Sequence, residues 1–306
     1  MYLSVCIATY RRPDRLAALL EDLARQRRLP DQIVVVDNDP GGSARDVIER
    51  CRAAGAPFSI DYDIQPEPNI ALTRNRTVSL ARGDWLASVD DDERAPDSWL
   101  EQLIEAAALY AADGVLGPVD PQVPAEAPHW IRRGRFYDFP RMPSGAVVPL
   151  KRMRFGNVLL RGDLVRAEPG PFDASYGLAA GEDGDMLIRL VNRGGRIVWC
   201  DEAIVYEPIE SKRLSLQWLM RRALGGGQEF ARKSLLGRYG PISGPARVLF
   251  FARALAQMLI AAALALLSLP LGRHRSARWI ITASANFGKL SVFWGSRYRE
   301  YAVGHA

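Results

Sequence analysis

The chemistry of this chain is concentrated in four consecutive acidic residues, Asp90 to Glu93. They follow an apolar stretch, Trp85 to Val89, that has the composition of a buried strand. Neighbouring carboxylates repel one another, so a folded protein holds such a group most easily with a bound cation. Asp90 and Asp92 face the same way in an extended segment, so both can reach one hard divalent ion such as Mg²⁺ or Mn²⁺. The alternative is a solvated acidic turn that caps the helix starting near Asp97, a residue that can itself act as a cap.

A second acidic group, formed by Glu182, Asp183 and Asp185, stands at the start of another expected helix. Carboxylates there complement the helix dipole, which is one explanation of the group. The other explanation is general base catalysis. A sugar hydroxyl that attacks an anomeric carbon must lose its proton, and a carboxylate within hydrogen-bond reach can accept it. Departure of a diphosphate from one face and attack from the other would invert the stereochemistry.

The elements that must position these groups alternate between apolar strands and amphipathic helices. We expect strands over 2–9, 33–36, 58–64 and 85–89. We expect helices from Pro13, after a capping box of Ser43 and Asp46, and over 70–81. This β-α-β-α-β-α-β order predicts an α/β fold with an open, mostly parallel sheet. Ligands bind such sheets beyond the carboxyl ends of the strands, where three polar segments fall: 9–12, 37–39 and 90–93.

The middle of the chain continues this pattern with one long interruption. Segment 118–149 is rich in Pro, Arg and aromatic residues and is too long for an ordinary connection, so we interpret it as a functional loop or lid. Further strands are expected over 115–117, 155–160, 196–200 and 203–206. A helix over about 214–223 carries Trp218, Arg221 and Arg222 and is expected to end at the glycines 225–227.

Towards the end of the chain the composition becomes strongly apolar. Residues 254–271 are mostly Ala, Leu, Ile and Met, close to the minimum length of a membrane-spanning helix. Arginines flank the segment, with Arg253 before it and Arg273, Arg275 and Arg278 after it. Three interpretations stay open: a segment embedded in the membrane, a helix in the membrane interface, or a helix buried in a homodimer.

The composition indicates the cellular compartment of the protein more clearly than its function. A formal net charge of +5 is compatible with nucleic acid, anionic lipid or phosphorylated ligands, and by itself selects none of them. The three cysteines stand far apart in apolar patterns, which indicates thiols in a reducing compartment. The N-terminus has the pattern of a strand instead of a secretory signal, so we expect the catalytic part to stay in the cytoplasm.

Five segments together resemble glycosyltransferase family 2, the inverting enzymes of GT-A fold. They occur in order as VCIATYRR (5–12), VVVDND (34–39), ALTRNRTVSLAR (71–82), GDWLASVDDDE (83–93) and GEDGDM (181–186). The resemblance covers roughly residues 2 to 235. Within the family, the segments are similar to glucosyltransferases of succinoglycan-type exopolysaccharide assembly. The resemblance implies a GT-A domain over 1–210, acceptor or interface helices over 211–245, and a membrane-associating region over 246–306.

The resemblance also implies roles for individual residues. Asp183 would be the base and Glu182 would face acceptor or sugar, whereas Asp92, with Asp90, would hold the divalent metal. Residues lining the nucleotide-sugar site would be Thr9, Tyr10, Arg12, Asp37, Asn38, Arg74, Asp90 and Asp91. Relatives often carry a His where this chain has Tyr206. Trp218, Arg221 and Arg222 would lie between the active site and the lipid surface.

We therefore predict a metal-dependent, inverting hexosyltransferase that uses Mg²⁺ or Mn²⁺. It would move a hexose, with glucose favoured, from a UDP-sugar to a polyprenyl-diphosphate-linked saccharide at the cytoplasmic face of the inner membrane. No nucleic-acid partner is expected. Two alternatives differ in their products: a sugar nucleotidyltransferase would release pyrophosphate, and a non-catalytic sugar-nucleotide or membrane-binding protein would release nothing.

Overall fold

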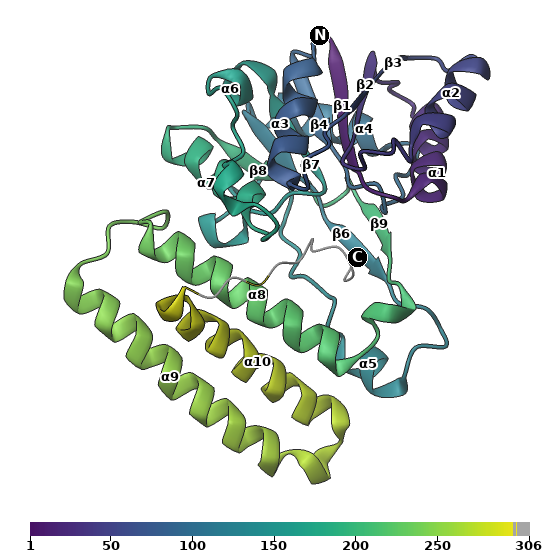
Figure 1. Ribbon diagram of the computed structural model, residues 1–306. Helices are drawn as coiled ribbons and strands as arrows, with labels where there is room; N and C mark the ends of the chain where they lie inside the picture. The colour runs from purple at the N-terminus through teal and green to yellow at the C-terminus, as the bar shows by residue number, and fades with distance from the viewer. Residues whose placement is uncertain (296–297, 299–306) are drawn as a thin grey trace. The chain divides into compact units, whose positions relative to one another are not determined.

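The computed structural model describes residues 1–295 and 298, which form two compact units. The first unit comprises residues 1–121, 139–177 and 182–207. The second comprises residues 122–138, 178–181 and the described residues from 208 onward. The chain therefore passes between the units several times, and the elements of both are labelled in Figure 1.

A seven-stranded sheet forms the centre of the first unit, in the order β3-β2-β1-β4-β7-β5-β8. β7 runs antiparallel to both β4 and β5, and the other neighbouring pairs are parallel. The predicted mixed α/β fold with a mostly parallel sheet is therefore confirmed. The strands are β1 (Leu3–Thr9), β2 (Gln32–Asp37), β3 (Ser59–Ile64), β4 (Trp85–Ser88), β5 (Gly114–Leu116), β7 (Val158–Arg161) and β8 (Ile197–Trp199).

The helices of this unit cover the sheet with the apolar faces that the sequence predicts. In α1, the leucines at i, i+3, i+4 and i+7 are all buried in the main core: Leu16, Leu19, Leu20 and Leu23. The same core takes Trp99 and Leu100 from α4 and the alternate side chains of β1. The helices are α1 (Pro13–Ala24), α2 (Arg45–Ala53), α3 (Ile70–Leu80), α4 (Trp99–Leu109), α6 (Gly162–Arg166) and α7 (Glu182–Asn192).

Two predicted helix caps are wrong. The N-cap of α2 is Ala44, because the Ser43 hydroxyl bonds to the Asp37 carboxylate at 3.2 Å instead of capping the helix. The N-cap of α4 is Ser98, with no side-chain cap, so Asp97 does not cap that helix. At Ser43 a hydrogen bond within the loop after β2 competes with the helix cap.

Segment 118–149 contains regular structure and is not a plain loop. It includes β6 (Val119–Gln122), which pairs with β9 (Val205–Pro208) in a two-stranded sheet, and the short helix α5 (His129–Gly134). Arg94, directly after the acidic cluster, pairs through its backbone with Tyr206 of β9. This pairing attaches β9 to the chain that carries the acids.

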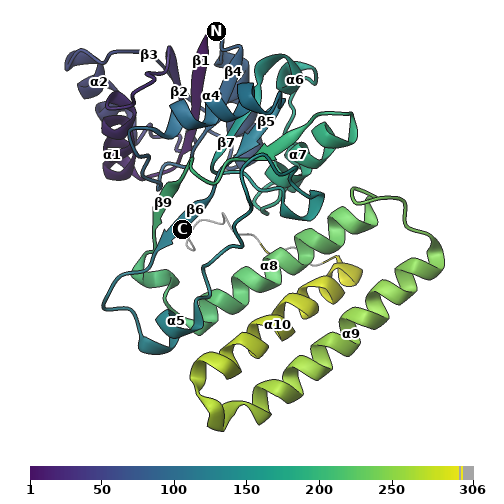
Figure 2. The ribbon, with the colours of Figure 1, turned by 180° about the vertical axis from the view of Figure 1, so that it is seen from behind.

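The second unit is built on three long helices: α8 (Leu216–Leu235), α9 (Gly244–Leu267) and α10 (Arg273–Ser291). α10 packs against both α8 and α9, and Figures 1 and 2 show it between them. The predicted end of α8 at the glycines 225–227 is wrong, because the helix runs through them to Leu235. A Cβ at Gly227 would meet the Ala285 backbone oxygen at 2.0 Å, so this glycine lets α8 and α10 approach closely.

One helix of the described chain is long and apolar enough to cross a membrane. This helix is α9. Its most apolar stretch of 18 residues has a mean hydropathy of 2.0, and 17% of that stretch is buried. The predicted apolar segment began at residue 254, but the helix starts at Gly244, where the Ser243 hydroxyl accepts a hydrogen bond from the Ala246 backbone. α10 had not been predicted as a helix.

Candidate active site

The ends of β1 and β4 bring together residues that lie far apart in the sequence. The Thr9 hydroxyl donates to the Asp91 carboxylate at 2.7 Å. The Arg12 guanidinium, at the start of α1, donates to Asp91 at 2.9 Å and to Asp92 at 3.1 Å. Arg15 lies 3.4 Å from Asp92. Residues at the end of β1 therefore donate hydrogen bonds, from a hydroxyl and from a guanidinium, to the acidic cluster at the end of β4.

The end of β2 is organised by Asp37, which is fully buried. Its carboxylate accepts hydrogen bonds from the backbone of Asp39 at 2.9 Å and of Ala44 at 2.8 Å, and from the hydroxyls of Ser43 and Tyr62. Desolvation and the Asp37 charge raise the pKa of Tyr62 to about 12. In this conformation Asp37 fixes the loop after β2.

Asn38 links the end of β2 to the chain that leads into α3. Its amide donates to the backbone oxygens of Gln65 at 2.7 Å and Glu67 at 2.6 Å, and its oxygen accepts from the Asn69 backbone at 3.2 Å. Tyr10 is half-buried, with the Arg11 guanidinium 5.2 Å from its ring centre. Binding of a uracil edge by Asn38 and stacking by Tyr10 stay predictions.

The cluster Asp90 to Glu93 is more buried than its charge would suggest. Asp91, Asp92 and Glu93 are buried, whereas the side chain of Asp90 is 47% exposed. Desolvation is the largest cause of a raised pKa at Asp90, to about 6, and the charges of Asp92 and Asp91 add to it. Desolvation likewise raises the pKa of Asp91 and raises that of Glu93 well above its ordinary value. The protein therefore holds several carboxylates where their ionisation is unfavourable.

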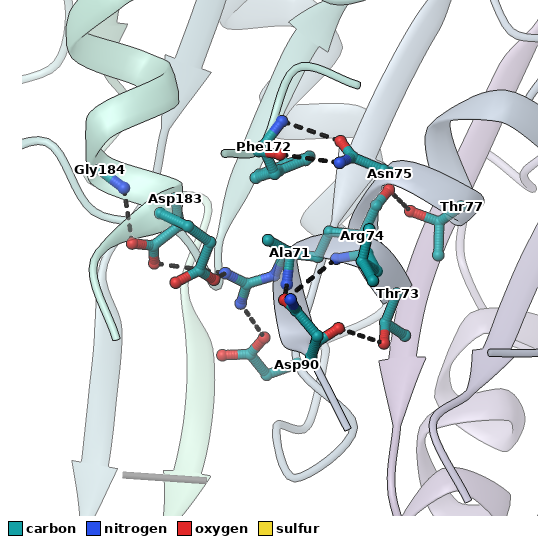
Figure 3. A network of polar contacts seen from close by, with 12 residues as sticks. Ala71, Thr73, Arg74, Asn75, Thr77, Asp90, Phe172, Asp183 and Gly184 are labelled. Atoms are coloured by element: carbon teal, nitrogen blue, oxygen red, sulfur yellow. Dashed lines mark hydrogen bonds and ion pairs between the residues drawn. The ribbon is translucent and has the colours of Figure 1, made fainter. Parts of the chain in front are cut away.

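Arg74 of α3 joins the two acidic groups that the sequence placed 90 residues apart. Its guanidinium donates to Glu182 at 2.5 Å and to Asp90 at 3.4 Å, and lies 3.5 Å from Asp183. Figure 3 shows this guanidinium with Asp90 on one side and Asp183 on the other. One buried cation thus lies between the candidate metal ligand and the candidate base.

Two aromatic rings also contact the Arg74 guanidinium, in addition to the acidic residues. Its central carbon lies 4.8 Å from the ring centre of Phe155 and 6.0 Å from that of Phe172. Asn75 fixes the Phe172 backbone through two hydrogen bonds of 2.8 Å, which Figure 3 also shows. The position of these rings beside Arg74 could not be predicted, because each comes from a loop more than 75 positions away in the sequence.

Asp183 and Glu182 differ in their access to solvent although they are neighbours on α7. The side chain of Glu182 is 1% exposed, whereas that of Asp183 is 25% exposed. The Asp183 carboxylate accepts a hydrogen bond from the Gly184 backbone at 2.6 Å, at the start of the helix. Asp183 is therefore the acid of this pair that a substrate can reach, and Glu182 holds Arg74.

The candidate metal ligands are carboxylates of the acidic cluster. Over residues 1–295 and 298, no group of three or more His, Cys, Asp and Glu side chains is arranged to hold a metal ion. Asp90 and Asp92 nevertheless supply the hard oxygen donors that Mg²⁺ and Mn²⁺ prefer. Desolvation raises the pKa of Asp90 and the charges of Asp92 and Asp91 raise it further, so a cation beside these carboxylates would favour their ionised forms. The donor set fits a metal completed by phosphate and water.

Trp218, Arg221 and Arg222 lie on α8, in the second unit. The Trp218 ring packs 5.9 Å from the ring of Tyr137, with the Arg213 guanidinium 5.7 Å away. Both arginines are exposed. A role of these three residues towards the acceptor or the lipid stays a prediction.

Comparison with known proteins identifies the family of this chain. A family model described as Glycosyl transferase family 2 matches residues 4–157, half of the chain. The chain belongs to glycosyltransferase family 2. It is 36% identical over 235 residues to the succinoglycan biosynthesis protein ExoM of Rhizobium meliloti, covering 76% of this chain and 75% of that protein. It is 29% identical over 221 residues to the galactofuranosyltransferase GlfT1 of Mycobacterium tuberculosis, covering 67% and 69%.

Solved structures of similar fold extend over nearly the whole chain of this family 2 member. The mannosyltransferase PcManGT from Pyrobaculum calidifontis, in complex with GDP-Man and Mn²⁺, matches with a TM-score of 0.68 at 17% identity, covering 96% of this chain and 88% of that one. TarS of S. aureus, residues 1–349 with UDP, matches with a TM-score of 0.54 at 19% identity, covering 98% and 93%. The GT-A fold implied by the family resemblance is confirmed.

Proposed function

We propose that this glycosyltransferase inverts the anomeric centre as it moves a hexose from a UDP-sugar to a polyprenyl-diphosphate-linked saccharide. The observation that carries the proposal is the Arg74 guanidinium between Asp90 and Asp183. This contact supports a site in which a cation that would bind phosphate lies beside a partly exposed carboxylate. The similarity to a succinoglycan biosynthesis protein favours exopolysaccharide assembly as the setting, and glucose is the sugar implied by the family resemblance.

The chain's own residues would divide the reaction as follows. Arg12 and Arg74 contact the donor phosphates, and Thr9, Tyr10 and Asn38 contact the nucleoside. Asp183 accepts the proton of the attacking acceptor hydroxyl, whose oxygen forms the new β-glycosidic bond as the bond to the diphosphate breaks. Glu182 keeps Arg74 in place. Asp92 and Asp90 would hold a divalent metal, which supplies Lewis-acid stabilisation of the departing diphosphate.

The acceptor and the metal have separate support. PcManGT, a protein of similar fold, was solved with Mn²⁺ and a nucleotide sugar, which favours a metal-dependent reaction here. The apolar helix α9 favours association with a membrane and hence a lipid-linked acceptor, and we propose the cytoplasmic face of the inner membrane as its place.

A donor screen tests the proposal most directly. Purified protein is incubated with a lipid extract, Mn²⁺ or Mg²⁺, and UDP-glucose, UDP-galactose or UDP-galactofuranose, and released UDP is measured. We expect UDP release with one donor, dependent on the extract and abolished by EDTA. Release of pyrophosphate would identify a nucleotidyltransferase. Binding of UDP without turnover of any donor would identify a non-catalytic binding protein.

A further inference from the structure

α9 leaves apolar side chains exposed along its entire length. Near its start Val248 is 70% exposed, near its middle Leu259 is 59% exposed, and at its end Leu267 is 71% exposed. The helix is 24 residues long, which corresponds to about 36 Å. An apolar strip of this length needs a covering environment.

The helix that accompanies α9 is too polar to enter a hydrocarbon core. α10 and the turn directly after it contact α9 at both ends: the ring of Phe293, two residues beyond α10, lies 6.0 Å from that of Phe251, and the Ser276 hydroxyl donates to the Ala265 backbone at 2.9 Å. α10 carries three arginines in its first six residues and Lys289 near its end, with buried Asn286 between. Since α10 lies along α9 from end to end, α9 cannot cross a bilayer without taking these groups with it.

Two other helices of the second unit contact this pair, α8 at the start of α9 and α5 at the start of α10. At the start of α9, the Phe250 ring lies 6.2 Å from that of Phe230 in α8. At its far end, α10 begins beside α5, where Arg278 donates to the Gly134 backbone at 3.1 Å and Arg273 lies 4.7 Å from the Trp130 ring. α5 and the start of α8 share one small core, which includes Ile131 and Leu219. α10 therefore flanks α9, and α8 and α5 in turn pack against α10.

Beside the far end of α9 is a concentration of positive charge, here named the arginine cluster. It consists of four exposed residues around His274: Arg133, Arg273, Arg275 and Arg278. Over the described residues, no carboxylate lies within ion-pair distance of these four side chains. Desolvation and then the neighbouring arginines lower the pKa of His274, which shows how closely the charges gather. Exposed Leu269 and Leu271 adjoin the cluster in the chain.

We infer that α9 lies parallel to the membrane, within the headgroup and acyl boundary of one leaflet, and that the arginine cluster binds anionic phospholipid headgroups there. Apolar side chains beside exposed arginines match the two layers of such a leaflet. The inference rests on the membrane association in the proposed function, and it excludes both a spanning helix and a dimer interface. Its test measures binding, so it can fail while UDP release succeeds, and the reverse.

Vesicle flotation tests the headgroup contact. The full chain is floated with vesicles of phosphatidylcholine alone and of phosphatidylcholine with phosphatidylglycerol. The double variant Arg133→Glu, Arg275→Glu should bind the anionic vesicles roughly 30-fold or more weakly than the wild type. The matched control, Arg50→Glu with Arg196→Glu, makes the same charge change at exposed positions of the first unit and should bind like the wild type. Equal losses in both variants, or in neither, would overturn the headgroup assignment.

Labelling tests the orientation of α9. Leu249, Ile260 and Leu267 are replaced one at a time by Cys in a Cys51→Ala background, since Cys6 and Cys200 are buried. Each protein is labelled with a fluorophore, bound to intact vesicles and exposed to external dithionite, which does not cross the bilayer. All three labels should be reduced to the same extent, with similar quenching by lipids brominated at one shallow depth. A spanning helix would protect one end and place residue 260 deepest. A dimer interface would show concentration-dependent association without lipid and no flotation.

Discussion

The arginines at the edge of the sheet and those of the arginine cluster differ in what surrounds them. Arg12 and Arg74 each contact two or more carboxylates, and these acids are mostly buried. Arg133 and Arg275 are exposed, and no carboxylate is paired with them in the described chain. A cation surrounded by acids can select a small ligand that completes the network. Cations without acid partners favour an extended anionic surface.

The largest expected effect is the loss of transfer in Asp183→Asn. The substitution keeps the size of the side chain but removes its ability to accept a proton, so we expect kcat to fall by about 10² to 10⁴. Calorimetric affinity for UDP should change little, because the arginine contacts to phosphate remain. UDP release with the preferred donor is the measurement.

Asp185→Asn serves as the matched control on the same helical turn. Asp185 is fully buried and bonds to Arg189 at 3.0 Å, so this variant should lose stability while each folded molecule keeps its turnover. Equal turnover losses in the two variants would mean that the helix start, and not the Asp183 carboxylate, matters for catalysis.

The second-largest expected effect is on stability, and it compares a buried ion pair with an exposed one. Arg74→Met removes the cation beside Glu182, whose side chain is 1% exposed, and we expect a cost of about 3–5 kcal/mol in urea unfolding. Arg76→Met, two residues along the same helix, removes an exposed pair with Asp63 and should cost at most about 1 kcal/mol. Similar costs for the two variants would contradict the importance assigned to burial.

The third effect lies in the second unit and tests how α8 packs on α10. Gly227→Ala puts a methyl group 2.0 Å from the Ala285 backbone oxygen, so we expect a loss of about 1–3 kcal/mol. At Gly226 a Cβ meets no atom within 4 Å, and Gly226→Ala should be neutral or stabilise the helix by up to about 1 kcal/mol. Thermal unfolding of the two variants is the comparison, and a destabilised Gly226→Ala would show that the helix itself requires the glycines.

These glycines also show which part of the fold could not be predicted from the sequence. The strands up to β4 were predicted almost to the residue, because buried parallel strands read as continuous apolar runs and their polar ends fall at one edge. The continuation of α8 through three glycines was missed, since its reason is the approach of α10 more than 50 residues later. Within the site, both acidic groups were visible as local runs. The Phe155 and Phe172 rings beside Arg74 were not, because only the fold brings them to it.

The smallest effect concerns the pH dependence of the acidic cluster before ligands bind. Desolvation is the main cause that raises the pKa of Asp90 from 3.8 to about 6, so the folded protein holds this proton more tightly than the unfolded chain does. The resulting contribution to stability is complete below pH 3.8 and is lost as the pH rises through about 6. Asp90→Asn carries no such proton, so its melting temperature relative to the wild type should rise across this window. Mn²⁺ should reduce that difference above pH 6 by stabilising the wild type more than the variant, which keeps Asp92 alone, whereas a difference independent of both pH and metal would contradict the role given to Asp90.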